Sequence, residues 1–309
     1  MICYNRINLW GIILAGGDGV RLGPLVKKIY GYLRPKQFCT FTGTRSMFRH
    51  TLDRAKILIS PEQIFTVVTK HQSQYSLEEI KCQLPETIVS QPCPRETSAG
   101  ILLAMLMINH KDSDSIVSIF PSDHFIKEEN RFMEFVKEAN EFVVNNPDSI
   151  VMLGVHPDRN ESGYGWIEQG NKITYEGDKT IYNVRKFWEK PDPVNAEILR
   201  HNGCLWNTFV LVGKSATFLK YIESSIPEVF NASKPIKSAL GSSSEETVIE
   251  STFPNIPAVN FSRFVLEKIP EHLHVMEISD VYWSDWGEEA RIRNDIEKLD
   301  LCSSIIVSA

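Results

Sequence analysis

The sequence predicts an α/β protein in which a mostly parallel sheet is covered by helices on both faces. Two observations support this fold class. Short apolar runs rich in β-branched residues alternate with longer segments of helical periodicity. The first apolar run leads directly into a glycine-rich loop, and ligands of such sheets bind beyond the carboxyl ends of the strands.

The predicted strands are short and rich in Val and Ile, and they cover Trp10–Leu14, Gln63–Thr69, Ile88–Ser90, Ile116–Phe120, Ile150–Gly154, Tyr182–Trp188, Thr208–Val212 and His274–Glu277. The predicted helices lie between them, at Met47–Lys56, Ser76–Gln83, Ser98–Asn109, Asn130–Asn145, Val194–His201, Ser215–Ser224 and Glu288–Leu299. The polar stretch Ser233–Glu246 is predicted to be a surface loop. Strand–helix alternation of this kind predicts right-handed crossovers.

Net charge, the length of apolar runs and the spacing of cysteines argue against several classes of protein. The 309 residues carry a net charge of −6, so the chain has no global basic field to attract nucleic acid. No apolar run reaches the roughly 18 residues of a membrane span. The scattered cysteines include no C-x-x-C pair, which argues against zinc and disulfides and favours a reducing cytoplasm. The run Leu9–Ala15 is too short for a signal peptide and lacks a cleavage site.

A glycine-rich loop near the start of the chain has the composition of a phosphate cradle. Gly16, Gly17 and Gly19 let the backbone approach a bulky anion and direct N–H groups at it. Arg21 and Lys36 add positive charge around this loop. The kinase and ATPase pattern Gly-x-x-x-x-Gly-Lys-Ser/Thr is absent, and a leucine replaces the third glycine of the dinucleotide motif. A dinucleotide oxidoreductase is therefore disfavoured.

Several motifs, in order over nearly the whole chain, resemble those of the sugar-1-phosphate nucleotidyltransferases. They are Leu14-Ala15-Gly16-Gly17-x-Gly19-x-Arg21-Leu22-x-Pro24, Pro35-Lys36-Gln37-Phe38, Phe120-Pro121-Ser122-Asp123-His124, Gly163-Tyr164-Gly165, Glu189-Lys190-Pro191, Trp206-Asn207-Thr208 and Asp285-Trp286-Gly287. Within this family they are most similar to the mannose-1-phosphate guanylyltransferases. The resemblance implies a Rossmann-like three-layer sandwich of the nucleotide-diphospho-sugar transferase, GT-A-like type.

Two acids are candidate Mg²⁺ ligands. Asp123 follows the strand Ile116–Phe120, where a carboxylate can hold a hard cation whose other ligands are phosphates and water. The residues alone equally allow Asp123 to cap the next helix and Asp285 to cap the helix Glu288–Leu299. The resemblance favours the metal, because the family has a metal-binding Asp in each motif.

The resemblance also implies two groups of binding residues. The nucleotide group is Leu14, Ala15, Gly16, Gly17, Gly19, Arg95, Thr97 and Asp123, and the sugar-phosphate group is Gly163, Tyr164, Gly165, Glu189, Lys190 and Asn207. Arg21, Lys36 and Lys190 are predicted to be catalytic, since a reaction between anions needs charge neutralisation. By themselves, Glu189 and Lys190 equally fit a solvated ion pair.

Three segments depart from the family pattern. Glu96 and Ser98 replace Asn and Ala of Arg-Asn-Thr-Ala, Thr208-Phe209 replaces Ser-Gly, and Ser262 replaces the acid of Ile-Asp-Tyr. These departures leave two alternatives open. One is a sibling enzyme that uses UTP, dTTP, CTP or ATP, or another hexose phosphate. The other is a catalytically silent homologue that binds a sugar nucleotide and regulates a partner.

The predicted function is Mg²⁺-assisted transfer of a nucleotidyl group to a hexose 1-phosphate, with release of pyrophosphate. GTP and mannose 1-phosphate are the predicted substrates. We expect one domain over residues 1–309, with the nucleotide held by about 1–125, the sugar phosphate by about 126–287, and a C-terminal helix and tail at 288–309, without a β-helix or cupin. Neither nucleic acid nor a membrane is expected as a partner, and a cytoplasmic homodimer is the candidate assembly.

Overall fold

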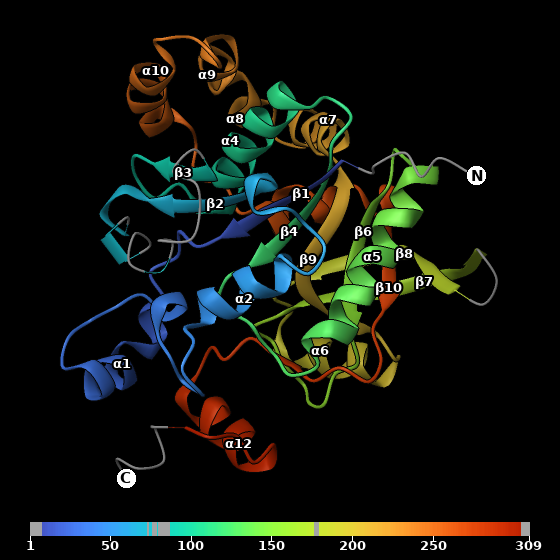
Figure 1. Cartoon of the computed structure of the whole chain (residues 1–309). Helices are drawn as coiled ribbons and strands as arrows, with labels where there is room; N and C mark the ends of the chain where they lie inside the picture. The colour runs from blue at the N-terminus through green and yellow to red at the C-terminus, as the bar shows by residue number, and fades with distance from the viewer. Residues whose placement is uncertain (1–7, 73, 76–78, 80–86, 176–178, 304–309) are drawn as a thin grey trace, which may run out of the picture.

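The computed structural model describes the chain apart from residues 1–7, 73, 76–78, 80–86, 176–178 and 304–309. A nine-stranded mixed sheet runs through this part in the order β3-β2-β1-β4-β9-β6-β10-β8-β7 (Figure 1). Its strands are β1 (Leu9–Leu14), β2 (Ile64–Thr69), β3 (Ile88–Gln91), β4 (Ile116–Pro121), β6 (Ile150–Val155), β7 (Gly165–Tyr175), β8 (Lys179–Glu189), β9 (Leu205–Lys214) and β10 (Leu273–Glu277). Strands β8 and β9 run opposite to the others, so the predicted mostly parallel sheet is confirmed.

Helices cover both faces of the sheet (Figure 1). The α-helices that the structure describes are α1 (Gly23–Tyr30), α2 (Met47–Ala55), α4 (Glu96–Lys111), α5 (Glu129–Asn145), α6 (Pro193–His201), α7 (Ser215–Ser225), α8 (Pro227–Ala232), α9 (Lys234–Ala239), α10 (Glu245–Thr252), α11 (Phe261–Phe264) and α12 (Glu289–Lys298). Among the helices that the structure describes, none is long and apolar enough to cross a membrane.

Two hydrophobic cores lie on the two faces of the sheet. One packs α4, α7 and α8 against side chains such as Ile12, and the other packs α2, α5 and α6 against side chains such as Ile13. Successive side chains of a strand point to opposite faces, so both neighbours in β1 are buried. Burial on both faces explains why the strands are nearly continuous apolar runs in the sequence.

A third, smaller core joins α1 and α12 and contains Phe125 and Trp286, whose rings stack with centroids 4.3 Å apart. Next to it, β5 (Phe125–Ile126) pairs with β11 (Trp283–Ser284) in a two-stranded sheet. The loop after β4 is thereby joined to the loop before α12. These two loops carry the acids Asp123 and Asp285.

Some predicted elements are corrected by the structure. The predicted loop Ser233–Glu246 contains the whole of α9. The two glycines of the motif Gly163-Tyr164-Gly165 predict a turn over 163–167, and this prediction is wrong in part, because β7 begins at Gly165. Glycine is needed there for packing, since a Cβ would lie 2.9 Å from the Phe187 ring. Apart from Glu79, which is helical, the predicted helix Ser76–Gln83 lies outside the described residues.

Candidate active site

A pocket of about 610 Å³ opens at the carboxyl ends of β1, β2 and β4. It is lined by most of the residues that the sequence predicted, namely Leu14, Gly16, Gly17, Gly19, Arg21, Arg95, Thr97, Asp123, Gly163, Tyr164, Gly165, Glu189, Lys190, Asn207 and Asp285. Ala15 and Lys36 are buried beside the pocket. The fold therefore gathers residues from motifs that are far apart in the sequence at one edge of the sheet.

The glycine-rich loop is held in place by the side chain of Gln37. Its Nε2 donates to the carbonyl oxygens of Ala15 and Gly17 at 2.7 and 2.8 Å. Because a trans peptide is planar, the N–H group that follows each of these carbonyls points away from Gln37. Gly19 has a φ of +60°, and a Cβ there would lie 2.6 Å from the Cβ of Lys36. Only glycine lets the loop pack this closely on Lys36.

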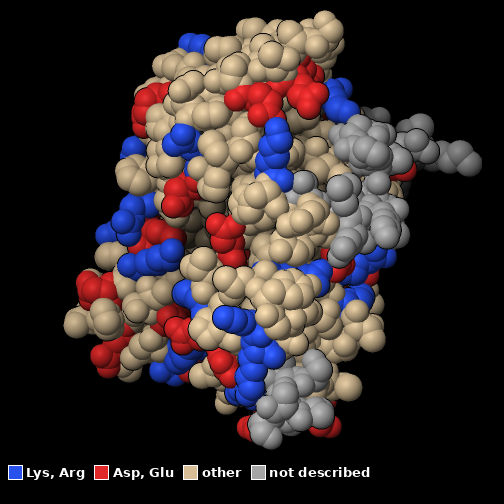
Figure 2. Space-filling model, turned by 90° about the vertical axis from the view of Figure 1, so that its left-hand side faces the viewer, with Lys and Arg blue, Asp and Glu red and all other residues tan. Residues whose placement is uncertain are grey.

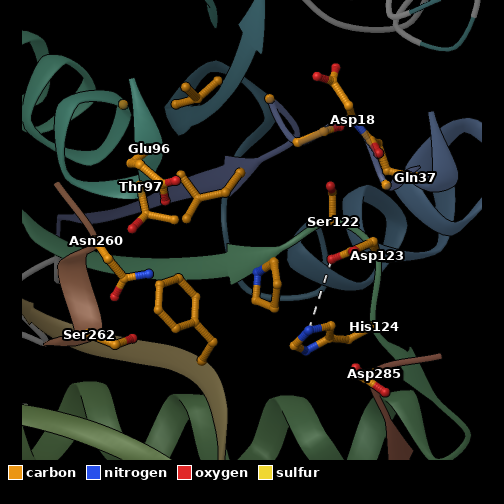
Figure 3. A pocket seen from close by; sticks show the side chains of 18 of the residues that line it. Asp18, Gln37, Glu96, Thr97, Ser122, Asp123, His124, Asn260, Ser262 and Asp285 are labelled. Carbon is orange, nitrogen blue, oxygen red and sulfur yellow. Dashed lines mark hydrogen bonds and ion pairs between the residues drawn. The ribbon is translucent and has the colours of Figure 1, made fainter. Parts of the chain in front are cut away.

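Lys36 joins the two loops that carry the candidate metal ligands. Its Nζ lies 3.1 Å from Oδ2 of Asp123 and also donates to the backbone carbonyl of Asp285. The residue is 4% exposed. Burial alone would raise the pKa of Asp123, but the charges of Lys36 and His124 hold it below its usual range. Asp123 is therefore a carboxylate at neutral pH. Figure 3 shows Asp123, His124 and Asp285 on the same side of the pocket.

Asp285 is oriented by three neighbours. The hydroxyl of Tyr164 donates to Oδ1, the backbone N–H of Gly287 donates to the same oxygen at 3.0 Å, and Nη2 of Arg21 lies 3.9 Å from Oδ2. Burial and the charge of Asp285 raise the pKa of Tyr164, so the phenol keeps its proton. The Tyr164 contact ties the predicted sugar-phosphate turn to a predicted metal ligand.

The donor set fits a magnesium ion. The helix-capping alternatives are wrong, because the N-cap residue of α5 is Glu128 and that of α12 is Glu288. Oδ2 of Asp123 and the backbone carbonyl of Asp285 both accept from the Lys36 ammonium, so the oxygens at this point already surround a positive charge. Among the described residues there is no cluster of three or more His, Cys, Asp or Glu side chains suited to a metal. Two carboxylates suffice for Mg²⁺, which commonly takes its remaining ligands from substrate phosphates and water.

The other side of the pocket carries groups suited to a sugar phosphate. Nζ of Lys190 lies 3.6 Å from Oε1 of Glu189. Burial raises the pKa of Glu189, although Lys190 opposes the shift. Oδ1 of Asn207 accepts from the N–H of Phe209 at 3.0 Å, which leaves the Asn207 amino group to donate to a ligand. A side chain on Gly165 would crowd Glu189 and Asn207, at 3.3 and 3.4 Å.

The backbone of β9 is strained where it enters the pocket. The register between β6 and β9 shifts between Met152 and Gly154, and Phe209 has a φ of +59°. This is the left-handed region that favours glycine, and it coincides with a position where the sequence pattern of the guanylyltransferases has glycine. The bulge places an aromatic residue in the lining of the pocket.

Arg95 and Thr97 lie in the lining, but both side chains have structural partners. Arg95 donates to the carbonyl of Pro254, and Oγ1 of Thr97 accepts from the N–H of Phe261 at 2.8 Å. They therefore anchor the start of α4 to the segment before α11. Sequence reasoning assigned no role to Gln37, although it quoted the motif that contains it, and it missed the contact of Tyr164 with Asp285.

The arrangement is that of an α/β protein with a pocket at the carboxyl ends of its strands, between a glycine-rich loop and a pair of acids. A family model described as nucleotidyl transferase matches residues 10–298, so the chain belongs to the nucleotidyl transferase family. The resemblance stated from the motifs is thus confirmed.

Known relatives and structures agree with this assignment. The chain is 29% identical over 287 residues to mannose-1-phosphate guanylyltransferase 2 of Escherichia coli O157:H7, covering 89% of this chain and 57% of the relative. It is 28% identical over 281 residues to mannose-1-phosphate guanylyltransferase of Klebsiella pneumoniae, again covering 89% and 57%. The chain thus spans little more than half the length of these relatives. A structure described as mannose-1-phosphate geranyltransferase from Thermus thermophilus shares the fold, with a TM-score of 0.77, 24% identity, and coverage of 91% of this chain and 76% of that one.

Proposed function

We propose that this protein transfers a nucleotidyl group from GTP to mannose 1-phosphate, releasing pyrophosphate. The observation that carries the proposal is the buried Lys36 ammonium held between Asp123 and the backbone of Asp285 at the edge of a pocket lined by the glycine-rich loop. The names of the curated relatives point to the same pair of substrates. Residues of about 1–125 would hold the nucleotide and about 126–287 the sugar phosphate.

In this reaction a phosphate oxygen of the sugar 1-phosphate attacks the α-phosphorus, and the bond from that phosphorus to pyrophosphate breaks. The nucleophile needs little help from a base, because the second pKa of a phosphate monoester is about 6. The difficulty is to bring anions together, so positioning and charge neutralisation dominate. Gly16, Gly17 and Gly19 would cradle phosphates, Arg21 and Lys36 would neutralise the triphosphate, and Lys190 would steer the sugar phosphate.

Asp123 and Asp285 would hold Mg²⁺, the ion predicted from the sequence. A divalent metal is general in this family of enzymes. When bound, such an ion supplies charge neutralisation at the phosphates. Lys36 would keep the two acids in register, because its Nζ contacts both loops. Glu189 would accept hydrogen bonds from sugar hydroxyls, and the Asn207 amino group would donate to them.

The test is pyrophosphate release with Mg²⁺ across a panel of nucleoside triphosphates and hexose 1-phosphates. Turnover fastest with GTP and mannose 1-phosphate is the expected result. Asp123→Asn should abolish Mg²⁺-dependent turnover. Its matched control is Asp114→Asn, which makes the same change at an 88% exposed side chain and should leave turnover intact. Preference for another pair would correct the substrates, and ligand binding without any release would favour the catalytically silent homologue.

The surface is consistent with small-molecule substrates. Lys and Arg are intermixed with Asp and Glu over the face shown in Figure 2. A cytoplasmic location and a homodimer remain part of the proposal. Sedimentation of the purified protein would test the assembly.

A further inference from the structure

The start of α4 places a carboxylate, that of Glu96, in the lining of the pocket. Glu96 is exposed and lines the pocket, and no residue that the structure describes makes a hydrogen bond or ion pair with its side chain. Its φ is +54°, a conformation that non-glycine residues adopt rarely and at a cost. Figure 3 shows Glu96 and Thr97 on the opposite side of the pocket from Asp123 and Asp285. The carboxylate therefore lies away from the two proposed metal ligands.

The side-chain amide of Gln91 lines the pocket together with Glu96. The amide of Gln91 lies against Gly100, where a Cβ would be 2.9 to 3.3 Å from its nitrogen, carbon and oxygen. A Cβ on Gly16 would lie 3.0 Å from the same amide nitrogen. Gly100 is one helical turn after Glu96 and hence on the same face of α4. The Gln91 amide thus lies close to two glycines and lines the pocket, next to the face of α4 that carries Glu96.

The chemistry of these groups matches one nucleobase. The two oxygens of a carboxylate accept two parallel hydrogen bonds from adjacent N–H donors. On its pairing edge, guanine presents two adjacent donors, N1–H and the 2-amino group, followed by the acceptor O6. Uracil and thymine present one donor between two acceptors. Adenine and cytosine present an amino group beside an acceptor nitrogen, which a carboxylate repels.

We infer that Glu96 selects guanine by accepting from N1–H and the 2-amino group, while the Gln91 amide donates to O6. This inference rests on the proposed nucleotidyl transfer and assigns its base specificity to one side chain. Arg95 and Thr97, the flanking residues, act in the anchoring of α4, since their side chains are bound to Pro254 and Phe261.

The test compares GTP with ITP, which differs from GTP only in lacking the 2-amino group. The wild type should favour GTP by about ten-fold or more in kcat/KM, as expected for a hydrogen bond to a charged group. In Glu96→Gln this ratio should fall to near one. Calorimetric binding of GDP and IDP gives the same comparison without turnover. The matched control is Glu62→Gln, the same change at an exposed carboxylate outside the pocket lining, which should keep the wild-type ratio.

The outcomes separate this inference from the proposed function. An undiminished preference of Glu96→Gln for GTP and GDP would overturn the role of Glu96 while leaving nucleotidyl transfer intact. The same holds for a wild type that releases pyrophosphate fastest with UTP or ATP. Absence of release with every nucleotide would overturn the proposed function, and binding of GDP and IDP with equal affinity by the wild type would overturn guanine selection.

Discussion

Asp295 of α12 should be required to hold Asp285 in place, and removal of its side chain should lower the free energy of unfolding. Its carboxylate is fully buried and accepts from the Tyr282 hydroxyl at 2.7 Å and from the Trp286 indole at 2.9 Å, with Nε of Arg291 at 3.6 Å. Asp295→Ala leaves a buried indole N–H without an acceptor, which costs about 1–3 kcal/mol. The variant also leaves Arg291 without its carboxylate partner, so the total loss of unfolding free energy should be roughly 3–5 kcal/mol.

Urea denaturation should show this loss in the free energy of unfolding. The control is Glu297→Ala, which removes an exposed carboxylate from the same helix and should change stability by less than about 0.5 kcal/mol. Because Trp286 directly follows Asp285 and stacks on Phe125, the folded fraction of Asp295→Ala should also need more Mg²⁺ for half-maximal turnover. Equal unfolding free energies for the two variants would refute the reasoning.

Three further changes test other parts of the structure. Lys36→Met should cost about 2–4 kcal/mol of transition-state stabilisation in kcat/KM, as loss of one oxyanion donor does. Lys27→Met, the same change at an exposed position of α1, should leave kcat/KM unchanged. A Lys36→Met enzyme within a few-fold of wild type would remove Lys36 from the chemistry. Phe209→Gly should be more stable than Phe209→Ala by about 1 kcal/mol in thermal or urea unfolding, because φ is +59°. In a regular strand Ala is more stable than Gly, so a more stable Phe209→Ala variant would contradict the strain. Burial would raise the pKa of Glu129, but the His50 hydrogen bond and the charge of Arg54 hold it below its usual range. Glu129 therefore stabilises the fold above its unfolded pKa of about 4.3 and loses this contribution as pH falls through its lower folded pKa. Glu129→Gln should be less stable than wild type at about pH 7, with the gap narrowing toward about pH 3 in urea denaturation at each pH; a constant gap would count against this account.

Local sequence signals were enough to predict most of the sheet. The strands around Ile12 and Val117 are apolar on both faces because helices cover both, and such runs are visible without any tertiary information. The fold was less predictable where local signals conflict. Gly165 suggested a turn, yet it begins a long strand whose close approach to Phe187 excludes a side chain.

In the candidate site, too, some features could be predicted from local sequence and others depend on tertiary contacts. The glycine-rich loop could be predicted from Gly16, Gly17 and Gly19, because glycine content is a local property. The role of Gln37 could not, since its bonds to Ala15 and Gly17 depend on how the chain folds back. The hydrogen bond from Arg95 to the carbonyl of Pro254 could not be predicted either, because the two residues are far apart in the sequence.

The sequence by itself determined the alternation of strands and helices, the family, and the residues available for phosphate, sugar and metal. Periodicity, glycine content and motif order are all written along the chain. Only the tertiary structure decided which of these side chains meet. It set Lys36 between two loops that carry Asp123 and Asp285, and it left the Glu96 carboxylate without a partner among the described residues. Such pairings join residues far apart in the chain, and packing and desolvation select them only when the whole sheet has formed.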